Sequence, residues 1–204
     1  ILSKSLCYLA DSSVGAISGS KILLNPKQSW VTKSEEAYLS SINKIKLGES
    51  KIYSTLFFEG GFSAYKREAI EKFDPYSTGS DDCGTIIKMM EQELRAITVP
   101  EAKFYTTFPK TWRGKIGIKL RRANQLIRVF STYFILLLKN QIKTAKGIVV
   151  QNTFLYLFCP VIFVLLLLLT LRLLLSFPLF SLILLVLFIP KLGLYLFETI
   201  QNYL

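Results

Sequence analysis

One stretch decides the class of this protein: residues 147–190, GIVVQNTFLYLFCPVIFVLLLLLTLRLLLSFPLFSLILLVLFIP. Arg172 is the one charged residue in it. A helix needs about 20 apolar residues to cross a bilayer, and the run on each side of Arg172 is long enough. Neither run has the polar face of a helix in a soluble core. We therefore predict a transmembrane hairpin over residues 147–204, with spans at about 148–171 and 177–197 joined by a turn at 172–176. The alternative is a buried helical hairpin.

The residues before this stretch are strongly basic. The 204-residue chain has a formal net charge of +11. Residues 103–146 contain 11 basic residues and no acidic one, whereas residues 1–102 are nearly neutral. Lysines 139, 143 and 146 predict, by the positive-inside rule, a multi-pass protein of the cell membrane with a cytosolic N-terminal domain. A basic block also suits nucleic acid, but this one adjoins the membrane and lacks an interleaved aromatic platform, so we predict no nucleic-acid partner.

Residues 115–130 have the periodicity of an amphipathic helix. The apolar residues recur at spacings of 4, 3, 4 and 3 and form one stripe: Ile116, Leu120, Ala123, Ile127 and Phe130. Polar and basic residues lie opposite. We expect residues 113–146 to form a basic interfacial helix and a linker, with 133–138 as the deeper end of that helix rather than a third span. The alternative is a helix packed on the soluble domain, and the two arrangements are compatible.

Residues 1–112 alternate between strand and helix patterns. Strands are predicted at residues 14–19, 55–58 and 95–99. Helices are predicted at residues 34–46, 66–73 and 85–94, and Ala37, Ser41 and Ile45 lie near one face of the first of them. Strands that alternate with helices indicate an α/β sheet covered by helices.

Asp81 and Asp82 are adjacent carboxylates directly before a predicted helix. Adjacent carboxylates repel, which favours proton uptake by one of them, so the pair suits a general base. The pair also suits a divalent cation. The alternative is a helix N-cap, because a carboxylate there accepts from free N–H groups and suits the helix dipole.

Two further pairs have the chemistry of a binding site. Arg121 and Arg122 suit a diphosphate held by paired guanidinium groups, and the alternative is a charge pair that faces lipid. Gly60 and Gly61 form a strand–turn–helix corner that permits close approach of a ligand to the backbone, and the alternative is a plain tight turn. The chain has no histidine and three scattered cysteines, so no metal site is predicted in it.

Taken in order, these features resemble the C-terminal half of the family-two glycosyltransferases, membrane enzymes of GT-A fold related to cellulose and hyaluronan synthases. The segments that carry the resemblance are Val-Gly-Ala-Ile-Ser-Gly at 14–19, Gly-Gly-Phe-Ser-Ala-Tyr-Lys-Arg at 60–67, Asp-Asp at 81–82, Val-Pro-Glu-Ala at 99–102, Phe-Pro at 108–109 and Lys-Leu-Arg-Arg-Ala at 119–123. The resemblance covers roughly residues 10–140. It implies an α/β fold in which residues 1–112 are part of a GT-A domain, followed by the interfacial helix and the transmembrane hairpin.

The resemblance also implies roles for the candidate residues. Asp82 is implied as the general base, with Asp81 beside it. Arg122, with Arg121 nearby, is implied to bind the donor diphosphate, and Gly60 and Gly61 lie on the acceptor side. The expected partners are a nucleotide sugar, a lipid-linked or saccharide acceptor and the membrane.

The sequence departs from the family pattern at three points. Lys119 and Ala123 stand where the Gln-x-x-Arg-Trp motif has Gln and Trp, which favours a single-addition enzyme over a processive synthase. The chain also has no Asp-x-Asp, the motif that ends the nucleotide-binding half and binds Mg²⁺ or Mn²⁺ in the family. We therefore expect an inverting membrane glycosyltransferase whose full-length form uses Mg²⁺ or Mn²⁺, and an inactive chain when these residues stand alone. The alternative is a non-catalytic membrane module, or a subunit that needs a separate donor-binding chain.

Overall fold

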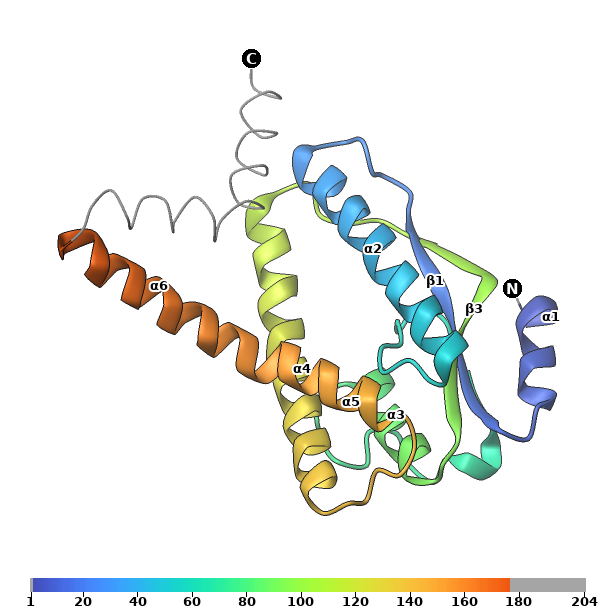
Figure 1. Ribbon diagram of the computed structural model, residues 1–204. Coiled ribbons are helices and arrows are strands. Elements are labelled where there is room, and N and C mark those ends of the chain that lie inside the picture. The colour runs from blue at the N-terminus through green and yellow to red at the C-terminus, as the bar shows by residue number, and fades with distance from the viewer. Residues whose placement is uncertain (1, 177–204) are drawn as a thin grey trace. The chain divides into compact units, whose positions relative to one another are not determined.

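The computed structural model describes residues 2–176 (Figure 1). The chain divides into two compact units, Ile1–Tyr156 and Leu157–Leu204. The first unit holds the sheet, the helices around it and every candidate site residue.

A three-stranded mixed sheet forms the centre of the first unit. Its strands are β1 (Val14–Leu23), β2 (Ser63–Tyr65) and β3 (Arg95–Thr106). The order is β2-β1-β3, with β1 antiparallel to β2 and parallel to β3. Residues 14–20 of β1 are buried, as expected for a central strand that is covered on both faces. The expected α/β sheet is confirmed, although β1 and β3 run further than predicted and β2 was not predicted.

Pro100 explains why β3 looked shorter in the sequence. Ser18 pairs with Thr98, and Ser20 pairs with Lys103, so residues 99–102 bulge opposite a single residue of β1. Proline has no N–H to donate to the ladder, which is why it is tolerated in a bulge. The strand resumes after the bulge and continues to Thr106.

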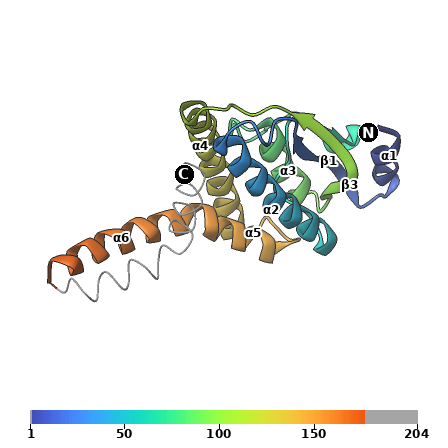
Figure 2. The same cartoon turned by 90° about the horizontal axis from the view of Figure 1, so that it is seen from above.

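Helices cover the sheet and continue the chain beyond it. The structure assigns them as α1 (Leu2–Ser5), η1 (Leu6–Ala10), α2 (Trp30–Ile52), η2 (Arg67–Ala69), α3 (Asp81–Glu91), α4 (Trp112–Leu138), α5 (Lys146–Thr153), a π-helical turn (Phe154–Phe158) and α6 (Cys159–Ser176). Figures 1 and 2 show α2 along one face of the sheet, with α4 beside α2 and α3.

Two predicted elements are wrong in type. Residues 55–58 are buried but not a strand, because they are joined to β3 mainly at one point, where the Thr55 N–H donates to the Ala96 carbonyl at 2.8 Å. Residues 66–73 are not an α-helix: the short 3-10 helix η2 lies there, because the Lys66 N–H donates to the Gly15 carbonyl at 2.8 Å and keeps the chain on β1.

The buried face of α2 carries charges. Ala37, Ser41 and Ile45 lie on its exposed side, whereas Glu35 and Lys46 are fully buried. A capping box fixes the start of the helix, since Ser29 and Thr32 bond reciprocally. Arg95 fixes its end by donating to the carbonyls of Tyr53 and Ser50 at 2.8 and 3.0 Å.

Helix α4 has three faces. One face packs on the domain through buried side chains: Val129, Phe130, Tyr133 and Leu136. The second is the predicted apolar stripe, which is exposed at Ile116, Leu120, Ala123 and Ile127 but buried at Phe130. The third is polar and carries the exposed Arg121 and Arg128. Residues 133–138 continue the same helix, so the expected extension is present.

In the described part of the chain, the helix over Lys146–Leu173 is long and apolar enough to cross a membrane by length and composition. It overlaps the first predicted span, although the start of that span packs on the first unit, where Val149, Asn152 and Thr153 are buried. The predicted turn at residues 172–176 is wrong, because α6 continues to Ser176 and the Leu-rich sequence around Arg172 favours helix. The second predicted span, 177–197, lies outside the described residues.

Candidate active site

A cleft of about 520 Å³ opens among β1, α2, α3, α4 and the segment 57–61. It is lined by all six candidate residues: Gly60, Gly61, Asp81, Asp82, Arg121 and Arg122. These residues come from three separate parts of the sequence. The structure therefore brings the two acids, the two arginines and the glycine corner around one space.

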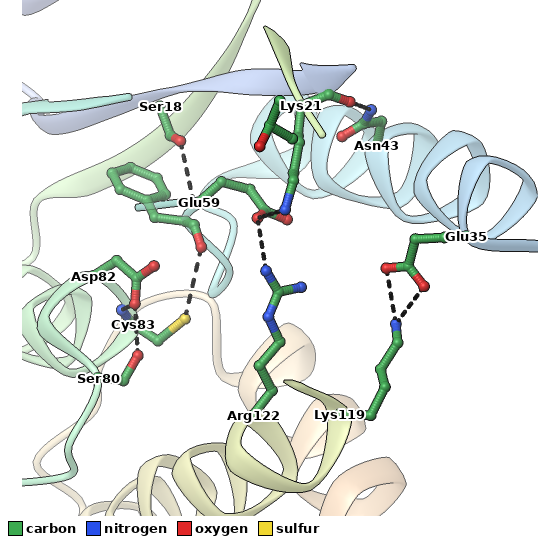
Figure 3. Close-up of polar contacts among 12 residues, drawn as sticks. Ser18, Lys21, Glu35, Asn43, Glu59, Ser80, Asp82, Cys83, Lys119 and Arg122 are labelled. Carbon is green, nitrogen blue, oxygen red and sulfur yellow. Dashed lines mark hydrogen bonds and ion pairs between the residues drawn. The ribbon is translucent and has the colours of Figure 1, made fainter. Parts of the chain in front are cut away.

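Asp82 lies in the first turn of α3, with Ser80 at the N-cap position. Its Oδ1 accepts hydrogen bonds from the Ser80 hydroxyl at 2.6 Å and from the Cys83 N–H at 2.8 Å (Figure 3). The N-cap position itself belongs to Ser80, while Asp82 accepts these bonds through one oxygen and its side chain lines the cleft.

The loop before α3 is built around Asp74, which the sequence analysis did not single out. Its carboxylate accepts from the Thr78 N–H at 2.9 Å and from the Gly79 N–H at 2.7 Å. Gly84 lets this loop lie directly on α3, because a Cβ at Gly84 would overlap the Asp74 carboxylate. Asp74 thereby fixes the approach of the chain to Asp81 and Asp82.

Gly60 and Gly61 form the centre of a tight turn, closed by the Phe62 N–H donating to the Glu59 carbonyl at 3.2 Å. A Cβ at Gly61 would overlap the ring of Phe104, so only glycine fits there without rearrangement. A Cβ at Gly60 would instead lie 3.6 Å from Asp82 Oδ2, an ordinary contact. The turn places Gly60 beside Oδ2 of Asp82, the oxygen that does not accept from Ser80 and Cys83.

Burial controls the protonation of two groups beside Asp82. Burial, with a smaller contribution from the Asp82 charge, raises the pKa of the Cys83 thiol to about 12. Burial also raises the pKa of Tyr65 to about 12. Both groups are therefore neutral at physiological pH, and Asp81 and Asp82 are the acids that α3 contributes to the cleft.

Glu59 is a site residue that sequence reasoning missed. Its Oε1 accepts from Lys46 Nζ at 2.9 Å, and its Oε2 lies 3.9 Å from both Lys21 Nζ and Arg122 Nη2 (Figure 3). Burial raises the pKa of Glu59, but the neighbouring cations, Lys46 foremost, outweigh it and leave the pKa below its ordinary value. The available signal was its position directly before Gly60, since a charged residue beside a cleft-lining turn is a candidate site residue.

Lys119 stands one helical turn before Arg122 and is held at the edge of the site. It donates to Glu35 Oε1 at 3.0 Å, and its ammonium lies 3.8 Å from the centre of the Tyr38 ring. Burial lowers the pKa of Lys119, and the hydrogen bond to Glu35 works against this shift. The α2–α4 contact therefore fixes the helix that carries Arg122.

Ala123, which stands at the Trp position of the family motif, is exposed and is not among the cleft-lining residues. Aromatic rings reach the cleft from elsewhere: Phe57, Phe58, Tyr65, Phe73, Phe104 and Tyr156. Phe73 is 56% exposed and meets Tyr65 edge to face at 5.6 Å. The cleft thus has aromatic surface without a Trp at position 123.

No group of three His, Cys, Asp or Glu side chains among residues 2–176 is placed to hold a metal ion. The two adjacent acids alone do not supply the ligand number that Mg²⁺ or Mn²⁺ takes from protein and substrate. The described residues therefore do not fit a metal centre of their own.

A model of glycosyl transferase family group 2 matches residues 3–197. The chain belongs to this family. Among curated proteins, no sequence matches it significantly. Among solved structures, the chain is similar to the mannosyltransferase PcManGT from Pyrobaculum calidifontis, which was determined in complex with GDP-Man and Mn²⁺. The two chains share 27% sequence identity, and their structures superpose with a TM-score of 0.58.

The match covers 77% of this glycosyltransferase-family chain and 41% of the mannosyltransferase. The chain thus spans less than half the length of that relative. The family and the mixed α/β fold agree with the resemblance seen in the sequence.

Proposed function

We propose that this chain forms the acceptor-side and leaving-group-side part of an inverting membrane glycosyltransferase, which transfers a sugar from a nucleotide-sugar donor to a lipid-linked or saccharide acceptor. One observation carries the proposal: Asp82, Arg122 and the Gly60–Gly61 turn line the same cleft in a member of glycosyl transferase family group 2. The mannosyltransferase bound to GDP-Man supports a nucleotide sugar as the donor.

In the proposed reaction, Asp82 accepts the proton of an acceptor hydroxyl. The hydroxyl oxygen forms a bond to the anomeric carbon while the bond from that carbon to the diphosphate oxygen breaks on the opposite side, which inverts the configuration. The electron pair leaves with the diphosphate. Arg122, with Arg121 nearby, neutralises the developing negative charge.

The complete enzyme is proposed to use Mg²⁺ or Mn²⁺, in line with the Mn²⁺ in the mannosyltransferase complex. Because residues 2–176 do not fit a metal centre, no step is assigned to the metal here. A nucleotide-binding half with an Asp-x-Asp motif would supply its ligands, either in the same polypeptide or in a separate chain.

A cell-membrane location, with the N-terminal unit in the cytosol and the chain crossing more than once, is part of the proposal. The exposed stripe of α4 supports it, since Leu120, Ile127 and Leu138 are 66%, 51% and 73% exposed. Arg113, seven residues before Leu120, and Arg128, one residue after Ile127, are exposed beside the stripe. A helix with an exposed apolar stripe flanked by basic residues suits the interface of an anionic membrane. The helix Lys146–Leu173 suits a span.

Asp82→Asn tests the base assignment, in protein expressed with whatever coding sequence precedes and follows these 204 residues. Asn keeps an Oδ1 that accepts from Ser80 and Cys83, so the fold should persist. We expect turnover to fall about 10²–10⁴-fold, the usual contribution of a general base. Asp81→Asn should cost less, because the Asp81 side chain is the more exposed of the two.

Glu93→Gln is the matched control, because it also removes one carboxylate charge but from an exposed pair with Lys143 outside the cleft. Sugar transfer is measured together with thermal unfolding of each variant. Normal turnover of folded Asp82→Asn would refute the base assignment.

The second candidate is a non-catalytic membrane module, or a subunit that needs a donor-binding chain. The observation in its favour is that the chain lacks Asp-x-Asp and aligns with 41% of the mannosyltransferase. The genomic sequence upstream of Ile1 discriminates the candidates: an in-frame Asp-x-Asp segment favours the single-chain enzyme, and a nearby start codon favours the module.

A further inference from the structure

The charges around Glu59 do not balance. Three cations, Lys21, Lys46 and Arg122, lie within 4 Å of this one carboxylate. Two of them are largely withdrawn from water, because the side chains of Lys21 and Lys46 are 11% and 2% exposed. The cluster therefore carries an excess of positive charge in a partly desolvated place, and such an excess is unfavourable without a further anion.

The two oxygens of Glu59 serve different partners. Oε1 is occupied by the hydrogen bond from Lys46 at 2.9 Å. Oε2 is 3.9 Å from Lys21 Nζ and from Arg122 Nη2, which is beyond hydrogen-bond distance in both cases. Lys21 and Arg122 are therefore attracted to Glu59 without donating a hydrogen bond to it.

The backbone holds this arrangement in place. The Glu59 N–H donates to the Ser18 hydroxyl at 3.4 Å, and the Lys21 carbonyl accepts from the Asn43 side-chain amide at 3.1 Å. Lys21 on β1, Glu59 before the glycine turn and Arg122 on α4 all face the cleft (Figure 3). The donors of the two cations are thus open to a ligand that enters there.

Burial is the largest cause of the lowered pKa of Lys21. The Glu59 and Glu35 carboxylates work against the shift, and the Arg122 and Lys46 charges lower the pKa further. A dianionic or trianionic ligand beside Lys21 would reverse these effects and stabilise the ammonium form.

We propose that Lys21 and Arg122 form an anion subsite for a phosphate or diphosphate group of a substrate, and that Glu59, anchored by Lys46, holds the two cations in position while the subsite is empty. This rests on the proposed function and extends it, because it assigns a second cation, Lys21, opposite the arginine, and a role to the carboxylate between them. The phosphate groups come either from the leaving diphosphate of the donor or from a phosphorylated lipid acceptor.

Isothermal titration calorimetry of the chain in detergent tests the subsite with two probes, inorganic diphosphate and geranyl phosphate. Lys21→Met removes the charge and keeps the length of a side chain that is nearly buried. Lys88→Met is the matched control, because Lys88 also pairs with one carboxylate, Glu91 at 3.1 Å, but does not line the cleft. We expect Lys21→Met to weaken binding about tenfold, as for the loss of one charge-assisted hydrogen bond, and Lys88→Met to leave it unchanged.

The two probes distinguish the source of the phosphate. A loss confined to diphosphate assigns the subsite to the leaving group, and a loss confined to geranyl phosphate assigns it to a lipid acceptor. Glu59→Gln, where it folds, should bind the responding probe more tightly than wild type, since a competing carboxylate is gone. Equal affinities of wild type, Lys21→Met and Lys88→Met for both probes, or no binding by wild type, would overturn the proposal.

Asp82→Asn separates this proposal from the catalytic one. The variant removes the proposed base but none of the cations, so it should bind the responding probe as wild type does. Lost turnover with retained binding supports both proposals. Retained turnover in Asp82→Asn contradicts the base assignment alone, and unchanged binding in Lys21→Met contradicts the subsite alone.

Discussion

At the scale of single residues, Glu59 has three cationic partners, Lys21, Lys46 and Arg122. No other acid that lines the cleft has as many. Lys46, 1% exposed, depends on it for a counter-ion. Breaking a buried pair by neutralising one partner is strongly destabilising, because the other charge stays buried. The same carboxylate therefore bears on folding and on ligand binding.

This pair predicts a pH dependence of stability. The folded-state pKa of Glu59 lies below its unfolded value of about 4.5, so its contribution is present above that pH and is lost as the pH falls through the lowered pKa. The thermal midpoint of wild type should exceed that of Glu59→Gln at neutral pH, and the gap should narrow on acidification. A gap that is constant over the titration would contradict the assignment.

Replacing each glycine of the turn by alanine should affect stability differently. Gly61→Ala places a methyl group in the ring of Phe104 and should lower the free energy of unfolding by about 1–3 kcal/mol, as overpacking does. Gly60→Ala meets only Asp82 Oδ2 at 3.6 Å and should fold normally. Gly117→Ala, in open space on α4, is the control. Thermal unfolding of the three variants checks the order, and equal loss at 60 and 61 would contradict it.

At the scale of elements, the sequence showed where helical periodicity lies, but it did not show which face of a helix is buried or what that face contacts. The helical pattern of α4 and its apolar stripe were found because their period is strict. The buried face of α2 was not found, because Glu35 and Lys46 look like solvent-exposed residues until their partners Lys119 and Glu59, distant in sequence, are known. The candidate residues of the cleft were found through motifs, whereas Lys21 and Lys46 have no local signal beyond their charge, and the signal for Glu59 was its position directly before Gly60.

Residues 55–58 illustrate a second limit. An apolar run bounded by glycines predicts burial correctly, and Leu56, Phe57 and Phe58 are buried. Hydrogen-bond partners are a separate property, and here they do not form a ladder: the Thr55 N–H donates to the Ala96 carbonyl, whereas the Phe57 N–H donates to the Thr55 hydroxyl. Burial can be predicted from composition, but strand pairing depends on neighbours that the run does not contain.

The faces of α4 predict that the adjacent residues Ile127 and Arg128 lie at different depths relative to the membrane surface. In a background with Cys7 and Cys159 replaced by Ser, a spin label at Ile127→Cys should collide with oxygen dissolved in the bilayer of proteoliposomes. A label at Arg128→Cys, the matched position one residue later, should collide instead with a water-soluble nickel reagent. Both positions are exposed, so labelling should not disturb the core. Equal collision rates at the two positions would show that the stripe does not contact lipid.

At the scale of the whole molecule, the cleft brings together the residues that we propose for base catalysis and for diphosphate binding, and residues 2–176 contain no cluster placed to hold a metal ion. We therefore predict that the isolated 204-residue chain, purified in detergent and supplied with nucleotide sugar and Mn²⁺, transfers no sugar. Adding the donor-binding half should restore transfer, because that half brings the nucleotide to Arg122. Sugar transfer by the isolated chain, measured by product formation, would contradict the prediction that the donor-binding half is required.

Three consecutive residues of α4 face three different surroundings: Ile127 is exposed on the apolar stripe, Arg128 lies on the polar face, and Val129 is fully buried. A single inserted or deleted residue rotates all that follows by about 100°. It would carry a core residue to the surface and a charge toward the core in one event. Natural variation in α4 should therefore consist of point substitutions, with length changes confined to the loops at its two ends.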